Sequence, residues 1–164
     1  MSVLIQILSG SAILVVCTLI HIGFEVWIVR RMRRSRHVGR SATAVESFVI
    51  CSGVVFCLLI SHTVQLYIWA VSIWLLGALP WYEEPIYFAL VTYTTVGYGD
   101  VTLPPDFRIF GAMAGVNGVL AFGMTTAFLV SFFPRIIAEF RETEQHAAGK
   151  TEQNQPKAIK DGKP

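Results

Sequence analysis

The sequence predicts an all-α membrane protein with three transmembrane helices and one shorter re-entrant segment. The chain of 164 residues is 54% hydrophobic and only 15% charged, whereas an ordinary soluble domain is about 25% charged. Its uncharged residues are also gathered into long runs, and about 20 apolar residues suffice for a helix to cross the hydrocarbon core. The composition argues against a soluble enzyme, and the net charge of +2 argues against a nucleic-acid partner.

The first expected element is a transmembrane helix over residues 1–29, because no charged residue occurs between Val3 and Phe24. A secretory signal would carry positive charge before its apolar run, whereas here the Arg residues follow it. They fall in a basic loop over residues 30–46. Since short Arg-rich loops stay in the cytoplasm, we expect the N-terminus outside the cell and the C-terminus in the cytoplasm. The membrane that contains the protein is expected to be the plasma or inner membrane.

Two further spans are expected over residues 47–77 and 108–134, both free of charge over nearly their whole length. The uncharged run Pro85–Gly99 between them is too short to span, which indicates a re-entrant segment. In this orientation every Lys and Arg except Arg108 lies on the cytoplasmic side. The polar tail, residues 136–164, is expected to be helical for a turn or two and then largely disordered.

The most informative run is Thr94-Thr95-Val96-Gly97-Tyr98-Gly99-Asp100, placed after the short segment and before a full span. In this run the sequence resembles the pore domain of potassium channels, and the resemblance covers residues 47–135. It implies an outer helix, a pore helix over 85–95, a selectivity filter over 95–99 and an inner helix over 108–134. One chain supplies one filter strand of the four that surround an ion, so a homotetramer in the lipid bilayer is implied.

The resemblance implies passive K⁺ conduction, with no catalysed reaction and no cofactor. Stacked backbone carbonyls replace the hydration shell of K⁺, and the filter residues expected to supply or shape them are Thr95, Val96, Gly97, Tyr98 and Gly99. Gly97 and Gly99 provide the positive φ angles that such stacking requires. The residues expected to support the filter are Thr94, Asp100, Tyr87 and Phe88. The sequence departs from familiar members at Phe88, where many have Trp, and at Val91, where some have an acidic residue.

Acidic residues are expected at the outer mouth of the pore. Glu83, Glu84 and Asp106 join Asp100 there against the single Arg108, and this negative charge would concentrate cations. Pro85 and the two Glu residues also suit the first turn of a helix.

The inner helix contains a run similar to the family's Gly-x-x-x-Phe-Gly pattern, formed by Gly118, Phe122 and Gly123. Gly118 is the expected hinge, and simple close packing of small residues is the alternative. Phe122 and Thr126 match cavity-facing positions of the family, and Asn117 is expected to face the cavity as well.

Four polar residues remain within the spans. His21 and Glu25 lie one helical turn apart in the first helix, and His62 and Gln65 form a similar pair in the second. Interhelical hydrogen bonds that dock the first helix on the second are the favoured interpretation. The alternative is that a histidine makes channel opening pH-dependent.

Two other functions are compatible with the sequence. One is a weakly selective cation channel, and the other is an accessory subunit of a potassium transporter. The gating stimulus cannot be predicted from these residues.

Overall fold

The structure is a computed structural model that describes residues 1–35 and 44–153, and this part of the chain is helical with short connections. Its elements are α1 (Val3–Ser35), α2 (Ala44–Leu75), α3 (Glu83–Tyr93), the 3-10 turn η1 (Pro105–Phe107) and α4 (Arg108–Gln153). Three segments are long and apolar enough to cross a membrane, namely Val3–Arg34, Val45–Leu75 and Pro105–Pro134. The predicted all-α class with three spans is therefore confirmed.

Several boundaries differ from those expected. The short helix begins at Glu83 and ends at Tyr93, two residues earlier than expected at each end. α4 passes through Pro134 without a break and continues to Gln153. The expectation of a largely disordered tail is therefore wrong as far as Gln153, and residues 154–164 lie outside the described residues, as do residues 36–43 of the basic loop.

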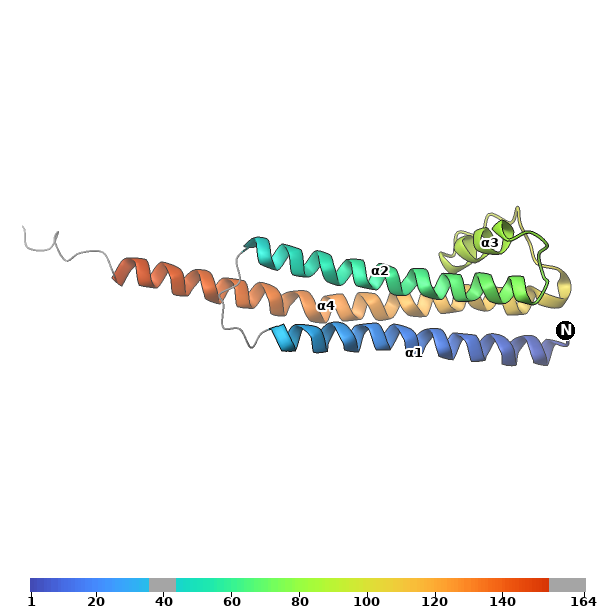
Figure 1. Ribbon diagram of the computed structural model, residues 1–164, viewed down its shortest axis with the longest axis horizontal. Coiled ribbons are helices and arrows are strands. Elements are labelled where there is room, and N and C mark those ends of the chain that lie inside the picture. The colour runs from blue at the N-terminus through green and yellow to red at the C-terminus, as the bar shows by residue number, and fades with distance from the viewer. Residues whose placement is uncertain (36–43, 154–164) are drawn as a thin grey trace, which may run out of the picture.

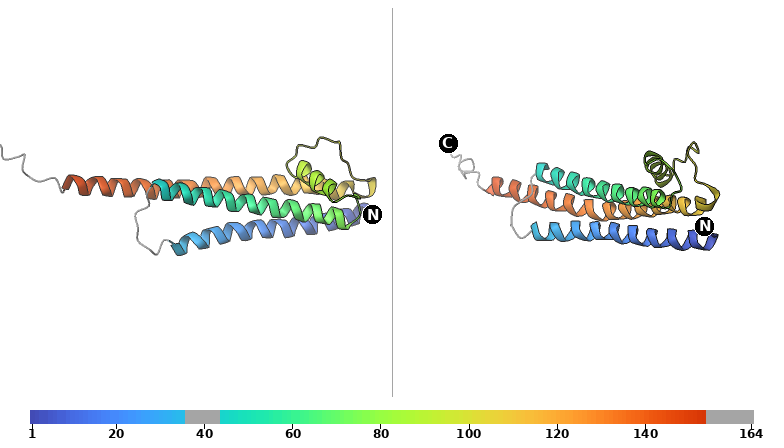
Figure 2. Two further views of the ribbon diagram at one scale, coloured as in Figure 1. Left: turned by 45° about the horizontal axis from the view of Figure 1, so that its top comes forward. Right: turned by 45° about the vertical axis from the view of Figure 1, so that its right-hand side comes forward.

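The three long helices lie side by side, and α3 lies at the end of the bundle where α1 begins (Figure 1). α3 packs against α2 and α4, and α1 packs against the same two helices. The further views in Figure 2 agree that α1 and α3 lie on different sides of the α2–α4 pair. The first helix is therefore an addition to the side of the bundle that faces away from α3.

Small residues on α4 let α3 approach closely. A Cβ atom added at Gly118 would overlap the carbonyl oxygen of Tyr93, and one at Gly115 would lie 3.2 Å from the carbonyl oxygen of Thr92. One at Gly111 would meet the ring of Phe88 at 3.0 Å. These three glycines form one stripe along α4, as is typical of helices that associate in lipid.

A side chain of α1 completes the start of α4. The first N–H groups of a helix have no partner within the helix. Gln6, which is 2% exposed, accepts through Oε1 from the backbone N–H of Ile109 at 3.1 Å and from that of Phe110 at 3.4 Å. α1 is thus tied to α4 by a polar contact as well as by apolar packing.

Candidate functional site

The segment that follows α3 is fixed to the last carbonyls of that helix. The backbone N–H of Thr94 donates to the carbonyl of Leu90 at 3.1 Å, and that of Thr95 donates to Thr92 at 3.0 Å. The N–H of Gly97 then reaches back to the carbonyl of Val91 at 3.0 Å. Through these bonds the position of α3 sets where residues 94–97 begin.

Between Thr95 and Gly99 the sign of φ alternates from residue to residue. Thr95 has φ +64°, Gly97 +56° and Gly99 +79°, while Val96 and Tyr98 between them keep negative φ. Positive φ was expected at the two glycines and is confirmed there. At Thr95 it was not expected, because a β-branched residue rarely adopts this conformation. Backbone strain of this kind is typical of functional segments.

The side chains of Val96 and Tyr98 do not pack against their own chain. Val96 is 51% exposed and Tyr98 is 72% exposed. A Cβ atom added at Gly97 or Gly99 would also meet nothing within 4 Å. The segment therefore presents an exposed face.

Two of the residues expected to support the filter meet directly. The hydroxyl of Tyr87 on α3 donates to Oδ2 of Asp100 at 2.6 Å, while Oδ1 of Asp100 accepts from the N–H of Val101 at 3.0 Å. The bond from Tyr87 holds the pKa of Asp100 below its ordinary value. The same bond is the largest reason that the pKa of Tyr87 is raised. The bond links the middle of α3 to Asp100, which directly follows Gly99.

The other two residues expected to support the filter, Thr94 and Phe88, contact other residues of their own chain. Thr94 donates from its hydroxyl to the carbonyl of Leu90 at 2.7 Å. The ring of Phe88 faces Gly111 of α4.

The acidic residues expected at the mouth lie at the α3 end of the bundle. Glu83 and Glu84 occupy the first turn of α3, where the helix dipole favours negative charge. Asp106 is exposed and its Oδ2 lies 3.5 Å from the N-terminal amine. Asp106 is thus placed beside α1.

The structure separates the residues expected on the inner helix. Phe122 is 42% exposed, and Thr126 and Gly123 are also exposed. Asn117 is 2% exposed and donates to Oε1 of Gln65 at 2.9 Å. The expectation that Asn117 faces a central cavity is therefore wrong, since its amide is used inside the protomer. At Gly118 the contact with Tyr93 favours the close-packing interpretation over a hinge.

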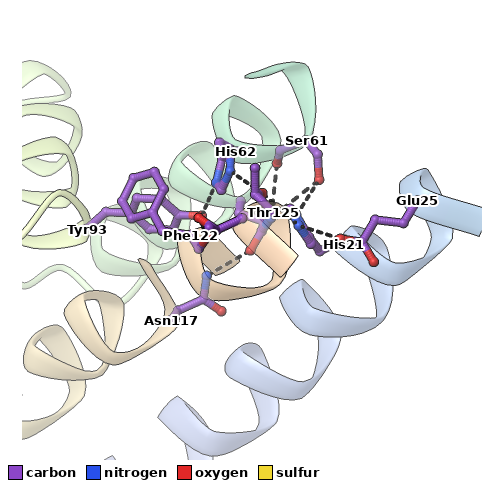
Figure 3. Close-up of polar contacts among 10 residues, drawn as sticks. His21, Glu25, Ser61, His62, Tyr93, Asn117, Phe122 and Thr125 are labelled. Carbon is purple, nitrogen blue, oxygen red and sulfur yellow. Dashed lines mark hydrogen bonds and ion pairs between the residues drawn. The ribbon is translucent and has the colours of Figure 1, made fainter. Parts of the chain in front are cut away.

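The polar residues within the spans meet in one cluster, which is buried except for the half-buried His62 and Thr125 and is drawn in Figure 3. We define the polar cluster by the residues His21 of α1, Ser61, His62 and Gln65 of α2, Tyr93 of α3, and Asn117 and Thr125 of α4. His21 lies 3.0 Å through Nδ1 from Oγ of Ser61 and 3.1 Å from Nε2 of Gln65. The favoured interpretation, hydrogen bonds between the first two helices, agrees with these contacts.

The second histidine has partners on two other helices. Nδ1 of His62 lies 2.9 Å from the hydroxyl of Tyr93, and its Nε2 lies 2.9 Å from Oγ1 of Thr125. Its ring also packs on Phe122, with 4.8 Å between the ring centroids. His62 and Gln65, which were expected to act as a pair, therefore bind different partners.

Glu25 lies beside the cluster, with its Oε1 3.5 Å from Nε2 of His21. The same oxygen is buried and has no hydrogen-bond partner among the described residues. Whether a histidine makes opening pH-dependent stays a prediction.

Sequence reasoning missed four participants, namely Gln6, Ser61, Tyr93 and Thr125. Gln6 could have been flagged as the one amide in a long apolar run. The two hydroxyl residues and Tyr93 carried no signal, because hydroxyl groups in a span commonly bond to their own helix, as Thr126 does at 2.8 Å.

The fold is that of a multi-pass membrane protein. Residues 95–99, which follow the short helix α3, contain three residues with positive φ. The family described as "Ion channel" matches residues 45–135, more than half of the chain. The chain therefore belongs to the ion channel family. Neither the curated proteins nor the solved structures yield a match to it.

Proposed function

We propose that the chain is one protomer of a homotetrameric, potassium-selective channel, with the filter formed by residues 95–99. The observation that carries the proposal is the alternating sign of φ from Thr95 to Gly99. In an extended strand successive carbonyls point to opposite sides, and alternation of φ lets them point to one side instead. A row of carbonyl oxygens facing one axis is what K⁺ requires when it leaves its hydration shell.

The proposal includes the topology and the site residues. The N-terminus faces outside, the C-terminus is cytoplasmic, and ions enter past Glu83, Glu84 and Asp100. The negative charge of these residues raises the local cation concentration. Phe122 and Thr126 line the water-filled cavity below the filter, K⁺ is the cargo, and the protein needs no cofactor.

The test is K⁺ flux into liposomes that contain the purified protein. Gly97→Ala forces a Cβ atom into a left-handed conformation, which costs about 1–2 kcal/mol in each copy, and should abolish K⁺-selective flux while the assembly persists. Tyr98→Ala should do the same. Gly77→Ala is the matched control, because Gly77 has φ +66° and open surroundings but lies outside the filter.

Retained selectivity in both filter variants would refute the assignment of the filter. The reversal potential between K⁺ and Na⁺ solutions separates a selective channel from a weakly selective one. Conduction by the purified protein alone would exclude an accessory subunit of a transporter.

A further inference from the structure

His62 occupies a position between the two helices on which conduction depends. It lies on α2, yet its two ring nitrogens contact Tyr93, the last residue of α3, and Thr125 of α4. The carbonyl of Tyr93 in turn lies against Gly118 of α4. Since residues 94–97 are bonded to the last carbonyls of α3, whatever fixes Tyr93 also fixes the start of the filter.

The direction of the hydrogen bonds can be followed from Gln65. Its Oε1 accepts from Nδ2 of Asn117 at 2.9 Å, which places its Nε2 toward His21. An amide nitrogen can only donate, so a bond from Nε2 of Gln65 at 3.1 Å makes Nδ1 of His21 an acceptor, and the hydroxyl of Ser61 at 3.0 Å then donates to the same nitrogen. A neutral imidazole carries one proton, and that proton of His21 is therefore on Nε2.

The chain continues through Thr125. Nε2 of His21 donates to Oγ1 of Thr125 at 3.2 Å, while Oε1 of Glu25 lies farther from the same nitrogen, at 3.5 Å. Among the described residues, the hydroxyl of Thr125 has one remaining acceptor within reach, Nε2 of His62 at 2.9 Å. His62 then carries its own proton on Nδ1 and donates to the hydroxyl of Tyr93 at 2.9 Å.

The result is a directed chain of hydrogen bonds that passes through all four helices (Figure 3). It runs from Asn117 through Gln65, His21, Thr125 and His62 to Tyr93. Every histidine in it is neutral, and each donates from one nitrogen and accepts at the other. Leaving a buried polar group without a hydrogen-bond partner costs free energy. Each bond in the chain therefore makes the neighbouring bonds more favourable.

We infer that His62 is a positioning residue for conduction: with its proton on Nδ1, it holds the carboxyl end of the pore helix against the inner helix. The inference rests on the proposed function, since it gives that filter a support within its own protomer. It also assigns a role to α1, because His21 sets the direction of the chain.

The first experiment is independent of conduction. Nitrogen-15 NMR of histidine-labelled full-length protein in lipid, in an H37Q/H146Q background, leaves the signals of His21 and His62. At about pH 7.5, above the ordinary histidine pKa, we expect His21 protonated on Nε2 and His62 on Nδ1. The same tautomer at both sites, or a doubly protonated ring, would overturn the inference.

The second experiment records single channels in planar bilayers. His62→Leu removes one hydrogen-bond partner from the hydroxyl of Tyr93 and one from that of Thr125, which keeps its contact with His21. We expect the mean open time to fall by about tenfold or more. His62→Gln keeps one donor and one acceptor and should remain within about threefold of the wild type. Thr18→Val is the matched control, because the hydroxyl of Thr18 bonds to the carbonyl of Leu14 in its own helix and, within the described residues, to no other helix.

A double-mutant cycle completes the test. Tyr93→Phe should shorten openings about as much as His62→Leu, and the combined variant should fall short of the product of the two effects, since both remove one bond. Multiplicative effects, or a His62→Leu channel that behaves like Thr18→Val, would overturn the inference. A wild-type protein without K⁺-selective current would instead refute the proposed function, and leaves the tautomer result standing.

Discussion

The bond between Tyr87 and Asp100 makes a prediction about acid at the mouth of the pore. Because the pKa of Asp100 is lowered, the bond is intact above the ordinary carboxyl range and is lost only as the pH falls through that lowered value. The raised pKa of Tyr87 keeps its proton in place at the alkaline end. Tyr87→Phe should therefore raise the pKa of Asp100, as measured by carbon-13 NMR titration of the labelled carboxyl group.

Tyr82→Phe is the control for this titration, since the ring of Tyr82 packs on Trp74 at 5.9 Å and not on Asp100. The same pKa of Asp100 with and without the hydroxyl of Tyr87 would contradict the prediction. Asp100 stays ionised and the bond persists over the neutral pH range. We therefore expect that Asp100 causes no change in K⁺ current with pH in this range.

Gly118 gives a second prediction at the residue scale. A methyl group at this position has no room against the carbonyl of Tyr93, and overpacking of this kind costs about 1–3 kcal/mol. Gly118→Ala should therefore lower the unfolding temperature measured by circular dichroism in detergent. Gly53→Ala is the matched control, because Gly53 is a helical glycine in open surroundings. Equal unfolding temperatures for the two variants would show that the close contact between Gly118 and the carbonyl of Tyr93 does not affect stability.

Residue types predicted part of the filter geometry and missed part of it. Positive φ at Gly97 and Gly99 could be expected, because glycine alone adopts it without a steric penalty. At Thr95 the same conformation is imposed by the surroundings, through the bonds that tie residues 94–97 to α3. A local pattern cannot signal such a constraint, because the residue itself disfavours it.

At the scale of elements, the extra helix α1 is bonded to α4 at two points, the start of α4 and Thr125. Gln6 accepts from the first N–H groups of α4, and His21 reaches Thr125 further along it. Loss of a side-chain acceptor at a helix start costs about 1 kcal/mol. Gln6→Ala should lower the unfolding temperature, whereas Gln6→Glu keeps an acceptor oxygen beside the helix start and should preserve it.

Ser9→Ala is the control for Gln6→Ala, since the hydroxyl of Ser9 bonds only to carbonyls of its own helix, those of Ile5 and Gln6. A Gln6→Ala protein as stable as Ser9→Ala would mean that the contact contributes nothing to stability.

The number and order of the elements could be predicted because runs of uncharged residues suffice to identify spans. The end of α4 could not, since its polar continuation from 136 to 153 has the composition of a solvated segment. The pattern predicted that α1 docks on α2 through hydrogen bonds of its polar residues, and the contacts of His21 with Ser61 and Gln65 agree. A partner on α4 such as Thr125 could not be predicted, because it is found only once the helices are packed. Asn117 was misplaced for the same reason.

At the scale of the whole molecule, a single chain leaves much apolar surface exposed. Tyr98, Val96 and the apolar faces of the spans are exposed in a single chain. Lipid can cover the spans, but the proposed filter follows α3 and is bonded to its end, on the side of the bundle away from α1 (Figure 2). If four filters face one axis, α1 lies at the periphery of the assembly and α3 lies near its centre.

The final prediction is that K⁺ stabilises this assembly more than Na⁺ does. Carbonyls from four chains bind one ion, and a ligand that binds only the assembled state stabilises it by about 2.7 kcal/mol at 100 times its Kd. Native mass spectrometry should detect four chains, and their dissociation temperature should be higher in KCl than in NaCl. Gly97→Ala should remove the difference while Gly77→Ala retains it, because only Gly97 lies in the filter. Equal dissociation temperatures in the two salts for the wild type would contradict a K⁺ site shared between chains.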